Sequence, residues 1–236
     1  MLVLFLACVP LFFLWRPFTR HNPWPRRFLG GITRIAGVKV RVSGQTPGPG
    51  AFLLANHVSW IDIPAIAGLT GSAFVAHDGL SSHPVLHWLC RMNDTVFVAR
   101  HDRKSVALQV EQVREAIRDT GALTIFPEGT TADGTCLLPF KSSLLSALDP
   151  VPEGIDVQPV WLDYGNDVPG IAWVGDEPGL DNFLRILARS RPVALTVHFL
   201  EPLAGDAIAN RKTMAAATQR AVAGAMANRQ GTGEWA

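Results

Sequence analysis

Two short groups of polar residues in the sequence have the composition of a catalytic site. The first is NHVSWID at residues 56–62, in which an imidazole and a carboxylate lie five residues apart. On one continuous helix, His57 and Asp62 would point about 140° apart and could not meet. If His57 instead precedes a helix that begins near Ser59, the carboxylate of Asp62 lies in the first turn and reaches back to the imidazole. Asp62 would then fix the histidine tautomer and stabilise the imidazolium formed on proton uptake.

The chemistry that suits such a pair is general-base activation of a substrate hydroxyl, without a covalent enzyme intermediate. The sequence contains no G-x-S-x-G elbow that would supply a serine nucleophile, so an esterase is not favoured. Taken alone, the pair also fits a structural role. Asp62 would then be a negative charge at a helix N-terminus, and His57 a hydrogen-bonded loop histidine.

The second group is FPEGTT at residues 126–131. It follows the apolar run Ala122–Ile125, just as NHVSWID follows the apolar run Ala51–Ala55. Both groups therefore place polar side chains where a buried strand ends, which is the ligand-binding end of the sheet in α/β proteins.

Short apolar runs alternate with helical stretches beyond residue 36, and several runs are apolar throughout, as in strands covered on both faces. The expected strands are Val38–Val42, Ala51–Asn56, Ala73–His77, Thr95–Ala99, Ala122–Phe126, Val157–Leu162 and Val193–Phe199. Amphipathic or alanine-rich stretches predict helices at Ser105–Asp119 and Asn210–Asn228. The alternation predicts a single α/β domain with a mostly parallel or mixed central sheet flanked by helices.

The first 15 residues, MLVLFLACVPLFFLW, are apolar and uncharged. As a helix they would be about 22 Å long, short for a hydrocarbon core of about 30 Å. The first 61 residues carry seven basic side chains and no acidic one. An apolar helix followed by basic residues predicts a membrane anchor, with residue 16 onward on the cytoplasmic side. The alternatives are a signal peptide, which lacks the basic start and cleavage site it would need, and a buried helix of a soluble domain.

Together, NHVSWID and FPEGTT resemble the first and third motifs, N-H-x-x-x-x-D and F-P-E-G-T, of the membrane glycerophospholipid acyltransferases of the lysophosphatidic acid acyltransferase type. Two weaker motifs follow the same order: a strand ending in arginine at Asn93–Arg100, and an apolar segment with proline at Val157–Val160. The resemblance implies an enzyme of lipid biosynthesis at the cytoplasmic face of the inner membrane. It would transfer a fatty acyl group from acyl-CoA or acyl-carrier protein to the free hydroxyl of a lysophospholipid.

The resemblance also implies roles for individual residues. His57 would be the general base and Asp62 its orienting partner. Arg100 would contact the anionic head group of the acceptor, because a guanidinium recognises phosphate through two hydrogen bonds. The acceptor site would be shaped by Glu128, Gly129 and Thr130.

One position departs from the pattern of the phosphatidate-forming members, which commonly read F-P-E-G-T-R: this chain has Thr131 in place of the arginine. FPEGTT, with LPFKSS at 138–143, is more similar to the lyso-ornithine-lipid and lysophosphatidylcholine branches. The main expectation is acylation of 1-acylglycerol-3-phosphate to phosphatidic acid, and a lyso-ornithine lipid or lysophosphatidylcholine is the alternative acceptor. Lys141 could replace the missing charge, although a solvated lysine at a helix start fits slightly better.

From these features we expect a membrane-anchoring segment at residues 1–36, an acyltransferase domain at 37–228 and a frayed tail at 229–236. No cofactor is expected besides the acyl donor. No metal is expected, because the histidines at 77, 83 and 87 lack a third ligand at motif-like spacing. A net charge of +1 gives no field for nucleic acid. The rival class is a lipid-binding membrane scaffold without catalysis, against which the intact His57 and Asp62 count.

Overall fold

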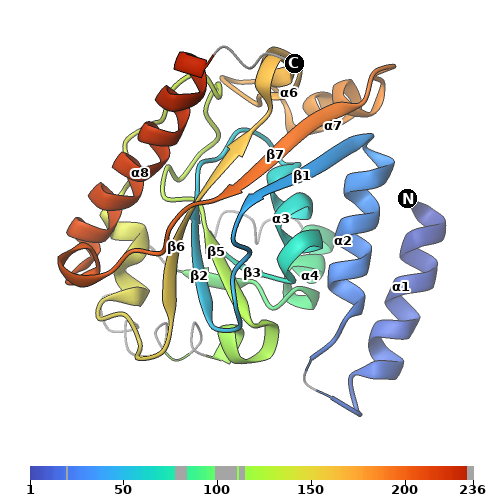
Figure 1. Cartoon of the computed structure of the whole chain (residues 1–236). Helices are drawn as coiled ribbons and strands as arrows, with labels where there is room; N and C mark the ends of the chain where they lie inside the picture. The colour runs from blue at the N-terminus through green and yellow to red at the C-terminus, as the bar shows by residue number, and fades with distance from the viewer. Residues whose placement is uncertain (20, 78–83, 99–110, 112–114, 233–236) are drawn as a thin grey trace.

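The computed structural model describes residues 1–19, 21–77, 84–98, 111 and 115–232. Its described strands form one seven-stranded sheet in the order β1-β7-β6-β2-β5-β3-β4 (Figure 1). The strands are β1 (Val38–Gly44), β2 (Ala51–Ala55), β3 (Ala73–His77), β4 (Val96–Val98), β5 (Ala122–Ile125), β6 (Asp156–Asp163) and β7 (Val193–Phe199). The pair β6 and β7 is antiparallel, and the other described pairs are parallel. The prediction of a mixed, mostly parallel α/β sheet is confirmed.

Helices cover both faces of the sheet. In Figure 1, α8 lies on one side, whereas α1, α2, α3 and α4 lie on the other. The helices are α1 (Leu2–Trp15), α2 (Trp24–Ile35), α3 (Asp62–Thr70), α4 (Pro84–Met92), α6 (Val168–Ile171), α7 (Gly179–Leu187) and α8 (Arg211–Thr232), with 3₁₀ turns η3 (Ser142–Leu148), η4 (Gly165–Asp167) and η5 (Gly205–Ile208). Helix α8 continues past Asn228, where we expected its end. Of the helix expected at Ser105–Asp119, the described part is helical, and the rest lies outside the described residues.

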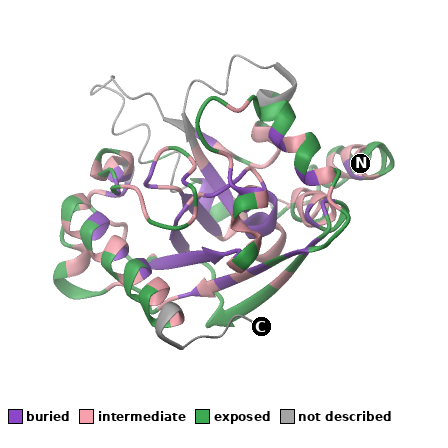
Figure 2. Cartoon of the chain, turned by 90° about the horizontal axis from the view of Figure 1, so that it is seen from above, coloured by how far each residue is buried: buried purple, intermediate pink, exposed green. Residues whose placement is uncertain are grey.

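Strand β2 explains why the apolar runs lack alternation. All five of its residues are buried. Phe52 and Leu54 belong to the apolar cluster that includes Met214 of α8, whereas Leu53 belongs to the cluster that includes Ile66 of α3. Successive side chains of a strand point to opposite faces, so a strand with helices on both sides is apolar at every position. Figure 2 shows such buried strands at the centre, with exposed residues on the surrounding helices.

Helix α2 packs closely against α3 through two glycines. A Cβ on Gly68 of α3 would lie 2.7 Å from the Cα of Gly30 in α2, so Gly68 has no room for a side chain, and a Cβ on Gly30 would lie 3.4 Å from the Cα of Gly68. Helix α1 in turn packs on α2, with the rings of Phe5 and Phe28 meeting edge to face at 6.3 Å. The first two helices therefore form a layer that is fixed to α3.

Much of α1 is apolar and exposed to solvent. Leu2, Leu6 and Leu14 are 70%, 61% and 65% exposed. Pro10 lies inside the helix without ending it. Within the described residues, no helix is both long enough and apolar enough to cross a membrane.

Three neighbouring strands of the sheet position the residues of interest. Strands β6, β2 and β5 are adjacent and parallel, so their carboxyl ends meet at one edge. Strand β2 leads into Asn56 and His57, β5 into the FPEG turn, and β6 into Tyr164. This edge is where ligands bind in α/β sheets.

Candidate active site

His57 and Asp62 form the hydrogen-bonded pair expected from their spacing. Nδ1 of His57 lies 2.8 Å from Oδ2 of Asp62. Helix α3 begins at Asp62, so the carboxylate stands in the first turn and reaches back to the imidazole on the preceding loop. The Asp62 side chain is fully buried, whereas that of His57 is 15% exposed. Donation of the Nδ1 proton to Asp62 leaves Nε2 as the ring nitrogen that can accept a proton.

The carboxylate of Asp62 also holds the loop that carries His57. Oδ2 accepts hydrogen bonds from the backbone N–H groups of Val58 at 2.6 Å and Ser59 at 2.9 Å. Oδ1 accepts a hydrogen bond from the hydroxyl of Tyr164 at 2.5 Å. One aspartate thus shapes the turn between β2 and α3 and orients the imidazole.

The imidazole ring is also fixed on one face. It stacks on Phe126, the first residue of the FPEGTT group, with ring centroids 4.0 Å apart and an interplanar angle of 14°. The ring of Phe126 in turn stacks with the ring of Phe74 in β3. The described residues offer Nε2 no hydrogen-bond partner, so this nitrogen is free to meet a substrate hydroxyl.

Glu128 connects the two sequence motifs through the backbone. Its fully buried carboxylate accepts a hydrogen bond at Oε1 from the N–H of His57 at 2.8 Å, and at Oε2 from the N–H of Leu138 at 2.9 Å. Burial raises the pKa of the Glu128 carboxyl above its usual value, against the lowering effect of these two hydrogen bonds. The carbonyl of His57 accepts a further bond from the N–H of Ala132. The backbone of His57 is therefore held on both sides, by Glu128 and by Ala132, which directly follows FPEGTT.

The next residues of this segment lie beside Lys141. Gly129 has a φ of +72°, a left-handed conformation that favours glycine. A Cβ at this position would also lie 3.3 Å from Nζ of Lys141 and 3.2 Å from Leu144. Lys141 is exposed at the start of η3, and its N–H donates to the carbonyl of Pro127. Thr130 is exposed.

Thr131, at the position where the sequence departs from F-P-E-G-T-R, has a partner inside the protein. Its hydroxyl donates to the carbonyl of Trp173, and the N–H of Trp173 donates to the carbonyl of Val58. The segment before α7 thus joins the loop after β5 to the loop after β2.

This contact gives a testable prediction. We expect Thr131→Val to lower the free energy of unfolding by about 1 kcal/mol, because the shape is retained while one hydrogen bond is lost. Thr131→Ser keeps the hydroxyl and should be close to the parent protein. Urea unfolding of the three proteins checks this. Equal stability of the valine and parent proteins would contradict the contact.

Two residues near the pair were given no role from the sequence. Tyr164 contacts Asp62, and the Asn56 side chain bonds both backbone groups of Leu162, accepting from its N–H at 2.7 Å and donating to its carbonyl at 3.2 Å. Tyr164 follows a buried strand, so the strand-exit argument that located the two motifs could have found it at the end of β6. Arg100 lies outside the described residues, and its proposed contact with the acceptor remains a prediction.

This geometry agrees with a known family of enzymes. A family model described as Acyltransferase matches residues 38–163, more than half of the chain. The chain belongs to this acyltransferase family and is an O-acyltransferase of lipid metabolism.

Individual relatives cover most of the chain. The lyso-ornithine lipid O-acyltransferase of Rhodobacter capsulatus is 33% identical over 221 residues, which are 89% of this chain and 79% of that protein. The protein of the same name from Rhizobium meliloti is 33% identical and covers 90% of this chain and 77% of its own. The 1-acyl-sn-glycerol-3-phosphate acyltransferase of Neisseria gonorrhoeae is 34% identical over 57% of this chain and 53% of its own.

The fold is also known from a crystal structure. The 1-acyl-sn-glycerophosphate acyltransferase PlsC of Thermotoga maritima has a TM-score of 0.62 over 98% of this chain and 97% of its own, at 20% sequence identity. The likeness extends over the N-terminal helices as well as the sheet, and it shows that the two chains share a fold.

Proposed function

We propose that this enzyme is a lyso-ornithine lipid O-acyltransferase, which uses acyl-CoA or acyl-carrier protein as donor. The observation that carries the reaction is the buried Asp62 carboxylate on Nδ1 of His57, with Nε2 of the same ring unbonded among the described residues. A histidine in this state accepts a proton at a defined point and keeps the resulting charge beside a carboxylate. The scaffold alternative gives no reason for such an arrangement.

In the proposed reaction, Nε2 of His57 removes the proton from the acceptor hydroxyl as its oxygen attacks the thioester carbonyl. The tetrahedral intermediate collapses, the carbon–sulfur bond breaks, and the ester forms. The proton on His57 then passes to the thiolate or to water. Asp62 stabilises the imidazolium while it exists. Glu128 holds the backbone of His57 in place, and Gly129, Thr130 and Lys141 are proposed to border the acceptor.

The acceptor follows from the relatives and from Thr131. The lyso-ornithine lipid enzymes align with about nine-tenths of this chain, whereas the 1-acylglycerol-3-phosphate enzyme of Neisseria aligns with little more than half. An arginine suits a phosphate head group, but residue 131 is a threonine whose hydroxyl is bonded to Trp173. An ornithine head group is an amino acid without phosphate. Lyso-ornithine lipid is thus better supported as the acceptor than 1-acylglycerol-3-phosphate, which remains the second candidate.

An acceptor panel tests this proposal. Purified protein in detergent would receive labelled acyl-CoA or acyl-carrier protein with lyso-ornithine lipid, 1-acylglycerol-3-phosphate or lysophosphatidylcholine. We expect the highest kcat/KM with lyso-ornithine lipid, and a kcat lowered by about 10²–10⁴-fold in His57→Ala. Selective acylation of 1-acylglycerol-3-phosphate would overturn the acceptor assignment and leave the reaction intact. Binding of lysolipid without transfer to any of them would favour the scaffold.

We also propose that α1 holds the enzyme at the cytoplasmic face of the inner membrane. Its exposed side chains, among them Leu2, Leu6 and Phe13, would lie among the acyl chains, and the arginines that follow would meet anionic head groups. We expect a Leu2→Ser, Leu6→Ser, Phe13→Ser variant to lose cosedimentation with anionic vesicles. Its thermal unfolding should be close to that of the parent protein, because these side chains are exposed. Undiminished vesicle binding would contradict the anchor.

A further inference from the structure

Asp62 is fully buried, so each of its carboxylate oxygens needs donors from the protein. Oδ2 receives three: the imidazole of His57 and the backbone N–H groups of Val58 and Ser59. Among the described residues, the hydrogen bond to Oδ1 comes from the hydroxyl of Tyr164, from an element 102 residues further along the chain. Contacts at Oδ2 alone leave the carboxylate free to turn about that oxygen. The bond at Oδ1 fixes its plane.

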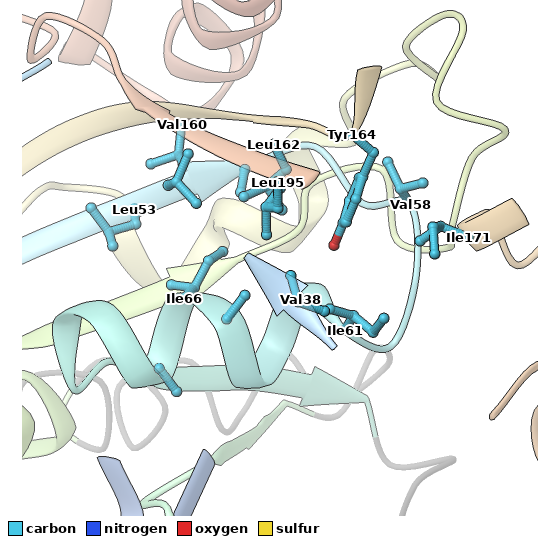
Figure 3. Packing of buried hydrophobic residues seen from close by; sticks show 14 of the residues in the cluster. Val38, Leu53, Val58, Ile61, Ile66, Val160, Leu162, Tyr164, Ile171 and Leu195 are labelled. Atoms are coloured by element: carbon cyan, nitrogen blue, oxygen red, sulfur yellow. The ribbon is translucent and has the colours of Figure 1, made fainter. Parts of the chain in front are cut away.

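The buried side chain of Tyr164 can hold the Asp62 carboxylate in one orientation. The side chain is 1% exposed and packs in the apolar cluster with Val58 and Ile171. Figure 3 shows its ring among these side chains, with the oxygen directed toward the side of the cluster where Ile61 lies, next to Asp62 in the chain. Burial and the neighbouring carboxylate raise the pKa of the phenol well above its ordinary value, so the hydroxyl stays protonated and remains a donor.

The backbone on both sides of Tyr164 is also held. The Asn56 side chain pairs with both backbone groups of Leu162, and the Asp163 carboxylate contacts Arg229 of α8 and accepts from the N–H of Gly165. Asn56 directly precedes His57. The end of β6 is therefore hydrogen-bonded to the loop that carries the imidazole. This fixes the position of Tyr164 relative to His57.

We infer that Tyr164 is a positioning residue for acyl transfer: its hydroxyl orients the Asp62 carboxylate so that Oδ2 faces Nδ1 of His57. The inference rests on the proposed role of His57 as general base. It adds a third group, directly after β6, to the two motifs that follow β2 and β5. Tyr164 acts through Asp62 and need not touch either substrate.

Removal of the hydroxyl is the first test. We expect Tyr164→Phe to lower kcat by about ten- to a hundredfold through misorientation of the base. The KM values for acyl donor and acceptor should stay within about twofold, because no substrate contact is lost. Thr218→Val is the matched control, since it removes a buried hydroxyl that donates to the Met214 carbonyl inside α8. This control should keep the parent kcat.

Tyr164 is the single tyrosine of the chain, which permits a sharper test that leaves the packing almost unchanged. Growth on 3-fluorotyrosine alters residue 164 alone and makes its phenol a stronger donor. A stronger hydrogen bond at Oδ1 withdraws charge from Oδ2 and weakens its hold on the imidazolium. The acidic limb of the pH profile of kcat/KM should then move to lower pH, whereas in Tyr164→Phe it should move to higher pH. Of the described titratable side chains around the pair, Glu128 and Tyr164, only Tyr164 is changed in the fluorinated protein.

Parallel measurement of His57→Ala distinguishes the positioning role of Tyr164 from the general-base role of His57. An inactive His57→Ala with an unimpaired Tyr164→Phe would overturn the role of Tyr164 and leave the proposed function standing. A pH profile that stays in place on fluorination would likewise reduce Tyr164 to a packing residue. An active His57→Ala would overturn the general-base mechanism, and the positioning role with it.

Discussion

Replacement of His57 by alanine should lower kcat by about 10²–10⁴-fold, the usual contribution of a general base. The fold should survive, because Asp62 keeps its bonds to Val58, Ser59 and Tyr164, and the imidazole is at the edge of the core. Steady-state kinetics with a labelled acyl donor and thermal unfolding of the same preparation measure the two effects separately.

His57→Gln provides the matched control. The glutamine amide can donate to Asp62 in place of Nδ1, but it cannot take up the proton of the acceptor hydroxyl. We expect the glutamine variant to unfold at a temperature close to that of the parent protein and to be as inactive as the alanine variant. Substantial transfer by either variant would show that the hydroxyl is activated in another way.

The second large effect is expected at Glu128. Glu128→Ala leaves the part-buried N–H groups of His57 and Leu138 without their acceptor, at a cost of about 1 kcal/mol each in the free energy of unfolding. The loop that carries His57 also loses its tie to the FPEGTT segment, and a shift of about 1 Å at the base can cost about 10²-fold in rate. Glu128→Gln retains one acceptor and should be less impaired in both respects. Urea unfolding and kcat/KM check the order parent, glutamine, alanine.

The raised pKa of Glu128 also predicts a pH dependence. A carboxyl whose pKa is higher in the folded protein binds its proton more tightly there, so it stabilises the fold most below its ordinary pKa of 4.5. This contribution is lost as the pH rises through the raised value. Glutamine does not titrate, so the stability deficit of Glu128→Gln should be largest near pH 4 and should shrink toward neutrality. A deficit that grows with pH would show that the hydrogen bonds, rather than burial, dominate the pKa of Glu128.

Much of the fold could be predicted because the strands are apolar throughout and end in recognisable turns. Each expected strand lies within two residues of the observed one. The order of strands could not be predicted in the same way. Strand β7 lies between β1 and β6 and runs antiparallel to β6, and this arrangement depends on packing between segments that are distant in the sequence.

The candidate site also has a part that could be predicted from the sequence and a part that could not. The geometry of His57 and Asp62 is local, since a turn and the start of one helix bring them together, and five residues of sequence were enough to predict it. Tyr164 contacts Asp62 across 102 residues. Its place after a buried strand could have marked it as a candidate, but no local pattern pairs it with Asp62. Glu128 was expected to shape the acceptor site, which stays a prediction, and its carboxylate binds two backbone N–H groups that the sequence did not indicate. A sequence motif does not indicate that a side chain will bind backbone N–H groups in this way.

If α1 lies in the bilayer as proposed, the contact between Gly30 and Gly68 links the depth of the enzyme in the membrane to its chemistry. Helix α3 begins with Asp62, and α2, which carries α1, is seated on α3 without intervening side chains. With α1 among the lipids as proposed, the base is held at a set height above the acyl chains, so a lysolipid must present its hydroxyl at that height. Bulkier residues at Gly30 or Gly68 would tilt the anchor and change which lipids reach the base, although they lie outside the active site.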